Sequence, residues 1–260
     1  MMNEVSTMGH PLSYRSLGLP SSDNTTQLVW GHGWMHTHSA LAPLADFFSR
    51  KYSNILLDFP GFGSSPMPSS VWGTRQYADH VASWLQTVPK QSRVWVGHSF
   101  GCRVGIQLAA HYPELIDGLF LIGAAGLPIK RSILGSAKIK SKIFTYKLLK
   151  RIVPTTALRE KLGAYFGSRD YATAGPMRPI FSAVIREDLS DVAKTVECPV
   201  FLVYGEMDTE TPVSMGDAFS KLFRRATLVR LPHFGHVDIL SDGMHQLRHH
   251  LLHFMKECSL

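Results

Sequence analysis

Short apolar runs alternate with helix-period stretches along most of this chain, and this alternation constrains its fold more than any other feature. The runs are rich in Val, Ile, Leu and aromatic residues and are bounded by turn-forming residues. The predicted strands are Gln27–Trp30, Asn54–Asp58, Val94–Gly97, Gly118–Ile122, Val200–Tyr204 and Thr227–Leu231. Such continuous hydrophobicity is typical of strands covered on both faces, so we expect an α/β fold with a mostly parallel central sheet flanked by helices.

The segments between these strands carry apolar side chains three or four residues apart, as amphipathic helices do. The predicted helices are Leu41–Arg50, Arg75–Val88, Phe100–His111, Val213–Phe223 and Met244–Lys256. Near the start of the chain, Leu12–Leu17 is expected to add an antiparallel edge strand.

The alternation is interrupted once, between residues 128 and 195, where the pattern is helical and shows no strand. We therefore expect an α/β core formed by residues 1–127 and 196–260, with 128–195 inserted as a helical cap or lid. From Pro128 to Asp170 there are eleven Lys and Arg residues against Glu160 and Asp170, a net charge of +9, so the rest of the chain nets −2 of the total of +7. The basic character is local, and no nucleic-acid partner is expected.

The remaining bulk features place the chain among globular proteins. Hydrophobic residues make up 45% and charged residues 18%, which differs from the composition of disordered chains. No apolar run approaches the roughly 18 residues of a membrane span, and the first residues lack the apolar block of a secretory signal. Three widely spaced cysteines suggest neither a disulfide framework nor a zinc site, so we expect a cytoplasmic, reducing location.

A serine lies between a predicted strand and a predicted helix in the sequence Gly97-His98-Ser99-Phe100-Gly101. The pattern Gly-x-Ser-x-Gly in this context is a nucleophile elbow, a sharp turn in which glycines two residues on either side avoid steric collision. The turn puts Ser99 at a helix N-terminus, where backbone N–H groups can stabilise an oxyanion.

With this elbow the chain resembles the α/β-hydrolase family, and further motifs occur in the family's order. Gly31-His32-Gly33-Trp34 resembles the turn that supplies one backbone N–H to the oxyanion, so the resemblance implies Trp34 and Phe100 as the two donors. The segment from Asp58 to Ser65 is similar to a supporting turn after the next strand and is given no chemical role. At Cys102 many relatives have glycine; the thiol either packs or narrows the acyl pocket.

The resemblance also implies the other two catalytic residues. Asp208 stands at the family's acid position, whereas Glu206 and Glu210 are interpreted as solvated loop charges. His236, preceded by glycine, matches the histidine, and His233 is expected to be a loop residue. A metal site on the terminal helix, at His249 and His253, is rejected because no third ligand is evident, and no cofactor is expected.

These residues together predict a serine hydrolase with Ser99 as nucleophile, His236 as general base and Asp208 as the orienting carboxylate. The preferred substrate is a carboxylic ester with a small-molecule acyl group. One alternative is carbon–carbon bond hydrolysis of a diketone-like acid, because the segment Gly123 to Pro128 is similar to a turn in hydrolases of aromatic ring-cleavage products. The segment Gly33 to His36 departs from the glycine-rich oxyanion turn of those enzymes.

Another alternative is a binding protein that keeps the fold without turnover. A serine rather than an aspartate at position 99 argues against the haloalkane dehalogenase and epoxide hydrolase branches. The basic insertion, if it forms a lid, would attract anionic substrates, an acidic carrier protein or an anionic membrane surface; the other interpretation is a solvated helix whose lysines keep it soluble.

Overall fold

The computed structural model describes residues 2–18, 26–89, 91–128 and 173–258. The chain divides into two compact units, one formed by Met1–Leu127 with Glu187–Leu260 and the other by Pro128–Arg186. In the second unit the described elements are the 3₁₀ helix η3 (Gly175–Met177) and helix α7 (Arg178–Val184). All eleven Lys and Arg residues between Pro128 and Asp170 lie outside the described residues.

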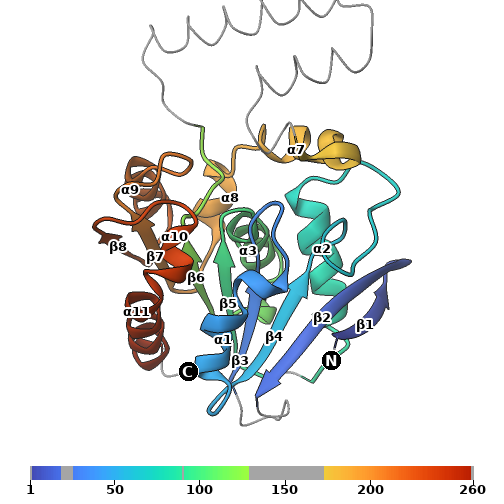
Figure 1. Cartoon of the computed structure of the whole chain (residues 1–260), viewed down its shortest axis with the longest axis horizontal. Helices are drawn as coiled ribbons and strands as arrows, with labels where there is room; N and C mark the ends of the chain where they lie inside the picture. Colours follow the sequence, from blue (N-terminus) through green and yellow to red (C-terminus); the bar gives the residue numbers. More distant parts are fainter. Residues whose placement is uncertain (1, 19–25, 90, 129–172, 259–260) are drawn as a thin grey trace, which may run out of the picture. The chain divides into compact units, whose positions relative to one another are not determined.

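The first unit is built on one eight-stranded sheet with the order β1-β2-β4-β3-β5-β6-β7-β8 (Figure 1). The strands are β1 (Met2–Thr7), β2 (His10–Gly18), β3 (Gln27–Gly31), β4 (Ser53–Asp58), β5 (Arg93–His98), β6 (Gly118–Ile122), β7 (Val200–Gly205) and β8 (Ala226–Leu231). All pairings from β4 to β8 are parallel, and only β1 with β2 and β2 with β4 are antiparallel. The predicted fold class, a mostly parallel sheet flanked by helices, is confirmed.

Helices cover both faces of this sheet. They are α1 (Ala42–Phe48), α2 (Thr74–Leu85), α3 (Phe100–His111), α8 (Ser190–Thr195), α9 (Val213–Leu222), α10 (Asp238–Ser241) and α11 (Met244–Glu257), with short 3₁₀ helices η1 (His38–Ala40) and η2 (Pro113–Leu115). In Figure 1, α1 and α11 lie in front of the sheet, and α2 and α3 lie behind it. Every residue of β3, β4, β5, β6 and β7 is buried, because both faces are covered.

The expected edge strand is wrong in one respect: Leu12–Leu17 falls in the antiparallel strand β2, but the edge of the sheet is β1. Residues Met2–Thr7 are mostly polar and show no apolar run, so the sequence pattern missed them. A two-residue hairpin joins β1 to β2, with φ of 49° at Met8 and 76° at Gly9. Positive φ at both central residues matches the twist of an antiparallel pair.

The two ends of the insertion return to neighbouring points of the first unit. Leu189 N–H donates to the carbonyl of Gly126 across 2.8 Å. Helix α8 packs against α3 and α9, and it belongs to the first unit because the boundary between units follows Arg186 rather than residue 195. The core sequence therefore resumes nine residues earlier than the strand pattern alone suggests.

Candidate active site

The order of the strands brings several sequence motifs to one edge of the sheet. The order in which parallel strands are added to the sheet reverses at β3, because β4 lies on one side of it and β5 on the other. In open α/β sheets, sites form beyond the carboxyl ends of the strands near such a point. The loops after β3, β5, β6, β7 and β8 all leave from this edge (Figure 1).

Ser99 occupies a strained turn between β5 and α3. Its φ of 51° and ψ of −106° lie outside the regions that most residues adopt. A Cβ atom at Gly97 would lie 2.9 Å from the Cys102 nitrogen, and one at Gly101 would overlap the Gly31 carbonyl. The two glycines of the motif are therefore required by close backbone contacts.

The carbonyl of Ile122, at the end of β6, holds this turn in place. It accepts a hydrogen bond from Ser99 N–H at 3.0 Å and another from Cys102 Sγ at 3.3 Å. Cys102 is fully buried, and burial raises the pKa of its thiol. Its observed contacts are those of a packing residue that supports the Ser99 backbone.

Ser99, His236 and Asp208 form a continuous chain of hydrogen bonds. His236 Nε2 lies 2.9 Å from Ser99 Oγ, and His236 Nδ1 lies 2.7 Å from Asp208 Oδ2. A carboxylate only accepts, so Nδ1 carries the proton and Nε2 is left to accept from the serine hydroxyl. The structure thus brings together three residues that stand at positions 99, 208 and 236 of the sequence.

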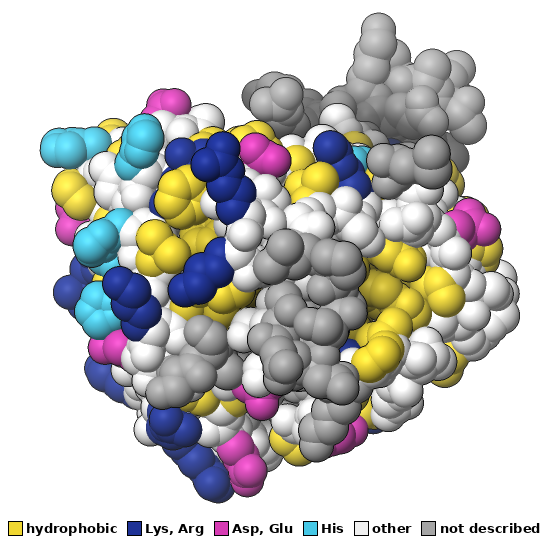
Figure 2. All heavy atoms as spheres, turned by 90° about the horizontal axis from the view of Figure 1, so that it is seen from below, with side chains coloured by type: hydrophobic (Ala, Val, Ile, Leu, Met, Phe, Trp, Pro, Cys, Tyr) yellow, Lys and Arg dark blue, Asp and Glu magenta, His cyan; other side chains and the backbone are white. Residues whose placement is uncertain are grey.

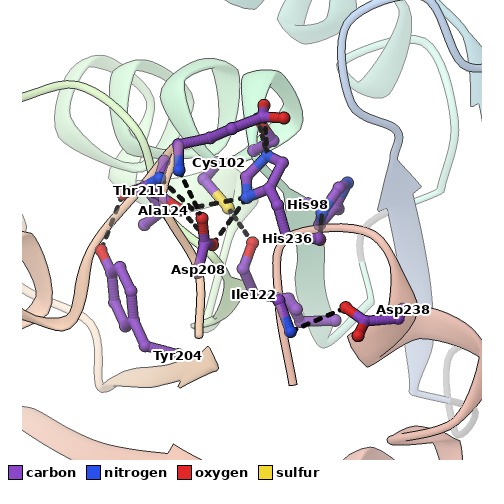
Figure 3. Close-up of polar contacts among 12 residues, drawn as sticks. His98, Cys102, Ile122, Ala124, Tyr204, Asp208, Thr211, His236 and Asp238 are labelled. Carbon is purple, nitrogen blue, oxygen red and sulfur yellow. Dashed lines mark hydrogen bonds and ion pairs between the residues drawn. The ribbon is translucent and has the colours of Figure 1, made fainter. Parts of the chain in front are cut away.

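Asp208 is buried and fully hydrogen-bonded (Figure 3). Its Oδ1 accepts from the N–H groups of Glu210 and Thr211, both at 2.8 Å, and its Oδ2 accepts from Thr211 Oγ1 at 2.7 Å. Burial acts to raise the pKa of Asp208, but the hydrogen bonds from His236 and Thr211 outweigh it and lower that pKa. The group therefore stays ionised beside the imidazole.

Thr211 is a site residue that the sequence analysis did not identify. Its Oγ1 lies 2.7 Å from Asp208 Oδ2 and 3.1 Å from His236 Nδ1. Since Asp208 only accepts, the threonine hydroxyl donates to it. Its only sequence signal is its place three residues after Asp208, where its backbone N–H closes a turn on that carboxylate.

The two glutamates of the same loop differ from each other. Glu206 is exposed, and within the described part of the chain its hydrogen bond runs from its backbone N–H to the Leu231 carbonyl. Glu210 is also exposed, but its Oε2 lies 3.6 Å from His236 Nε2. The interpretation of Glu210 as a solvated loop charge is therefore incomplete, because this carboxylate borders the reacting nitrogen.

The loop that carries His236 is joined to the Asp208 loop. Met207 N–H donates to the Phe234 carbonyl at 2.9 Å, and a Cβ atom at Gly205 would overlap that carbonyl oxygen. Gly235 N–H donates to Asp238 Oδ1 at 2.7 Å. His233 is exposed and has a φ of 69°. It lies in a turn of this loop.

The turn after β3 is fixed by His32 and Asp58. His32 Nδ1 donates to the Gly33 carbonyl at 2.8 Å and His32 Nε2 accepts from Phe59 N–H at 3.1 Å. Burial lowers the pKa of His32 to about 4, so the ring stays neutral in this role. Asp58 Oδ1 accepts from His38 N–H at 2.7 Å, so the carboxylate joins this turn to the segment after Trp34. Asp58 Oδ2 accepts from Ser64 N–H at 2.9 Å, within its own turn.

Trp34 and Phe100, the expected oxyanion donors, are neighbours. Their rings pack edge to face with centroids 5.5 Å apart, and the Phe62 ring lies 4.9 Å from that of Trp34. Phe100 is the first residue of α3, so its N–H lies among the helix's initial donors. Met35 has a φ of 60°, so it takes the backbone conformation that a glycine would take in this turn.

The described residues include no cluster of three His, Cys, Asp or Glu side chains able to hold a metal ion. On α11, His245, His249 and His253 are exposed at intervals of four residues. Figure 2, which views the molecule of Figure 1 from below, shows histidine side chains gathered at the left, the side on which α11 lies in Figure 1. None of the described helices is long and apolar enough to cross a membrane.

Comparison with known proteins gives several matches. A family model described as alpha/beta hydrolase fold matches residues 28–137. A 2-(acetamidomethylene)succinate hydrolase of Mesorhizobium japonicum is 25% identical over 69% of this chain and 70% of that protein. A pimeloyl-[acyl-carrier protein] methyl ester esterase of Chromobacterium violaceum is 25% identical over 86% of this chain and 93% of that protein.

A solved structure of a membrane phospholipase A, described as a bacterial virulence factor, has the same fold. Its TM-score is 0.77 at 23% identity, and the alignment covers 100% of this chain and 86% of that one. These three matched proteins are hydrolases whose names give different substrates.

Proposed function

We propose that this chain, which has the α/β-hydrolase fold, is a serine hydrolase that cleaves carboxylic esters through an acyl-enzyme. The observation that carries the proposal is the hydrogen-bonded chain from Ser99 Oγ through His236 to Asp208, with distances of 2.9 and 2.7 Å. A serine hydroxyl is a weak nucleophile at neutral pH, and this arrangement supplies the base that activates it.

In the first half-reaction, Ser99 Oγ attacks the ester carbonyl carbon while His236 Nε2 takes the hydroxyl proton. Asp208 stabilises the resulting imidazolium and holds the tautomer in which Nδ1 carries a proton. The N–H groups of Trp34 and Phe100 are the proposed donors to the tetrahedral oxyanion, each contributing about 3–4 kcal/mol by analogy with other oxyanion holes. When the intermediate collapses, the carbon–oxygen bond breaks and Nε2–H protonates the departing alcohol.

In the second half-reaction, water takes the place of the alcohol. His236 Nε2 accepts a proton from that water as its oxygen attacks the acyl carbon, and the proton then passes to Ser99 Oγ as the acid leaves. Two features support a rigid site for both steps: the backbone contacts at Gly97 and Gly101, and the bonds that join the loops of Asp208 and His236.

The esterase relative from Chromobacterium violaceum favours ester cleavage, because its similarity extends over most of both chains. Carbon–carbon bond hydrolysis remains the second candidate. This candidate is suggested by the segment Gly123 to Pro128. Gly123 has a φ of 54°, and a Cβ atom there would lie 3.3 Å from the His236 ring. Gly123 therefore lies beside the catalytic imidazole, where a diketone-like acid would also have to bind.

Partners and location are part of the proposal. The substrate is a small acyl compound. The basic insertion would attract anionic acyl groups, an acidic carrier protein or an anionic membrane surface. Its eleven Lys and Arg residues between Pro128 and Asp170 lie outside the described residues. A cytoplasmic location fits the three free cysteines, Cys102, Cys198 and Cys258.

The test uses p-nitrophenyl esters of graded chain length, a vinylogous diketone acid and a fluorophosphonate label. Ser99→Ala, His236→Ala and Asp208→Asn should fold normally and lose nearly all ester hydrolysis, and combined changes should be little worse than single ones. Labelling of the wild type but not of Ser99→Ala supports the enzyme. No labelling of either protein would favour a binding protein, and turnover of the diketone acid alone would favour carbon–carbon cleavage.

A further inference from the structure

Glu210 brings a second carboxylate to the imidazole of His236. Its Oε2 lies 3.6 Å from Nε2, the same nitrogen that is 2.9 Å from Ser99 Oγ. The Glu210 side chain is 60% exposed, whereas that of Asp208, which contacts Nδ1, is 1% exposed. One imidazole therefore has a buried carboxylate at one nitrogen and a solvent-facing carboxylate at the other.

The backbone of Glu210 is held in place, so the side chain starts from a fixed point beside the imidazole. Glu210 N–H donates to Asp208 Oδ1 at 2.8 Å, and the next residue, Thr211, also donates to that oxygen. The carboxylate can rotate on its side chain, but its Cα is tied to the acid that orients His236.

Proton transfer determines which part of a substrate meets Glu210. His236 Nε2 must protonate the departing alcohol oxygen, so that oxygen lies within about 3 Å of Nε2 when the bond breaks. Nε2 itself lies 3.6 Å from Glu210 Oε2. The sum of these two distances puts the alcohol oxygen at most about 7 Å from Glu210 Oε2. The acyl portion extends from the carbonyl carbon on the other side of the scissile bond. Glu210 thus acts on the alcohol portion of an ester.

We propose that Glu210 is a specificity-determining residue that favours esters whose alcohol portion is cationic and disfavours those whose alcohol portion is anionic. The inference rests on the proposed ester hydrolysis. Solvent screening limits the effect of so exposed a charge, and the interaction energy typical of exposed opposite charges corresponds to about two- to fivefold in kcat/KM.

A pair of esters with the same shape isolates this charge. Butyrylcholine and 3,3-dimethylbutyl butyrate differ in a quaternary nitrogen against a quaternary carbon, so their acyl groups and sizes match. The measurement is the ratio of their kcat/KM values at low ionic strength for the wild type, Glu210→Gln and Glu206→Gln. Glu206 is the matched control, since it is an exposed carboxylate on the same loop and its hydrogen bond to the described residues is made by its backbone.

We expect Glu210→Gln to lower the ratio about two- to fivefold by slowing the choline ester, while Glu206→Gln keeps the wild-type ratio. High salt should lower the ratio more in the wild type than in Glu210→Gln, because charges elsewhere are screened equally in both proteins. An equal ratio in the wild type and Glu210→Gln, with both esters still turned over, would overturn the role of Glu210 and leave ester hydrolysis intact. Absence of turnover of every ester and of fluorophosphonate labelling would instead overturn the proposed function, and this inference with it.

Discussion

His98 donates a hydrogen bond from Nε2 to the main-chain carbonyl of His236 across 2.9 Å. His98 directly precedes Ser99, so this bond joins the nucleophile's turn to the histidine's loop without using either catalytic side chain. Because a carbonyl only accepts, the His98 proton is on Nε2. Burial, aided by nearby His236, lowers the pKa of His98 to about 3, so the ring remains a neutral donor.

We expect His98 to act as a positioning residue for His236. His98→Leu removes the donor and should lower kcat about tenfold or more with little change in KM, because small displacements of a base are costly. His98→Gln offers an amide donor from a side chain of similar length and should recover most of the loss. Ester kinetics and thermal unfolding of both variants check this; equal losses in Leu and Gln variants of equal stability would contradict it.

Thr211 should contribute through its hydroxyl. Thr211→Val removes the donor to Asp208 Oδ2 and leaves the backbone bond to Oδ1, so kcat/KM should fall about tenfold, the effect of one hydrogen bond to a charged group. Thr211→Ser keeps the hydroxyl and should remain within about twofold of the wild type. The comparison is made with a neutral p-nitrophenyl ester. A Val variant as active as the Ser variant would exclude the role.

The sequence predicted the buried strands and the serine elbow well because each is a local pattern. The order Ser99, Asp208, His236 also followed from the family resemblance, and the structure brings these side chains within hydrogen-bond distance. The contacts that His98, Thr211 and Glu210 make with His236 could not be predicted, because each depends on how loops distant in sequence pack together. His98 and His236 are separated by 138 positions, and no local pattern indicates that they meet.

Met35 should be a strained position in the turn after β3. Its φ of 60° is costly for a side chain, by about 1–2 kcal/mol, and its side chain is 47% exposed. Met35→Gly should therefore raise the free energy of unfolding by about 0.5–1 kcal/mol, after the greater chain entropy of glycine is subtracted. Met207→Gly, at an exposed methionine that does not have a positive φ, is the control and should be destabilising. Denaturant unfolding measures both, and a destabilised Met35→Gly would contradict the prediction.

Acid should destabilise the fold through its buried histidines. Burial lowers the pKa of His32 and His80 to about 4 and that of His98 to about 3, against an ordinary value of 6.5. Below pH 6.5 the unfolded chain therefore binds more protons than the folded chain, so stability is fully present above that pH and is lost as pH falls toward 4.

His80 lies away from the active site, where its ring contacts Thr7 Oγ1 at 3.0 Å, and it offers the cleanest test. His80→Gln cannot titrate, so its loss of stability between pH 6.5 and 4.5 should be shallower than that of the wild type by up to about 1.4 kcal/mol per pH unit. Urea unfolding at several pH values gives the slopes. Parallel curves would show that His80 is not one of the groups responsible.

The charged part of the insertion lies outside the described residues, and its proposed role is tested by salt. If Lys138, Lys140 and Lys142 help to steer anionic acyl groups, kcat/KM for an ester with an anionic acyl chain should fall as ionic strength rises, because screening acts on encounter between charges. A neutral ester of the same length should change little. Replacing the three lysines with glutamine should reproduce that selective loss at low salt, and the choline ester, whose charge is on the alcohol side, should not be slowed. Equal responses of the anionic and neutral esters would favour the other interpretation, in which the lysines only keep a solvated helix soluble.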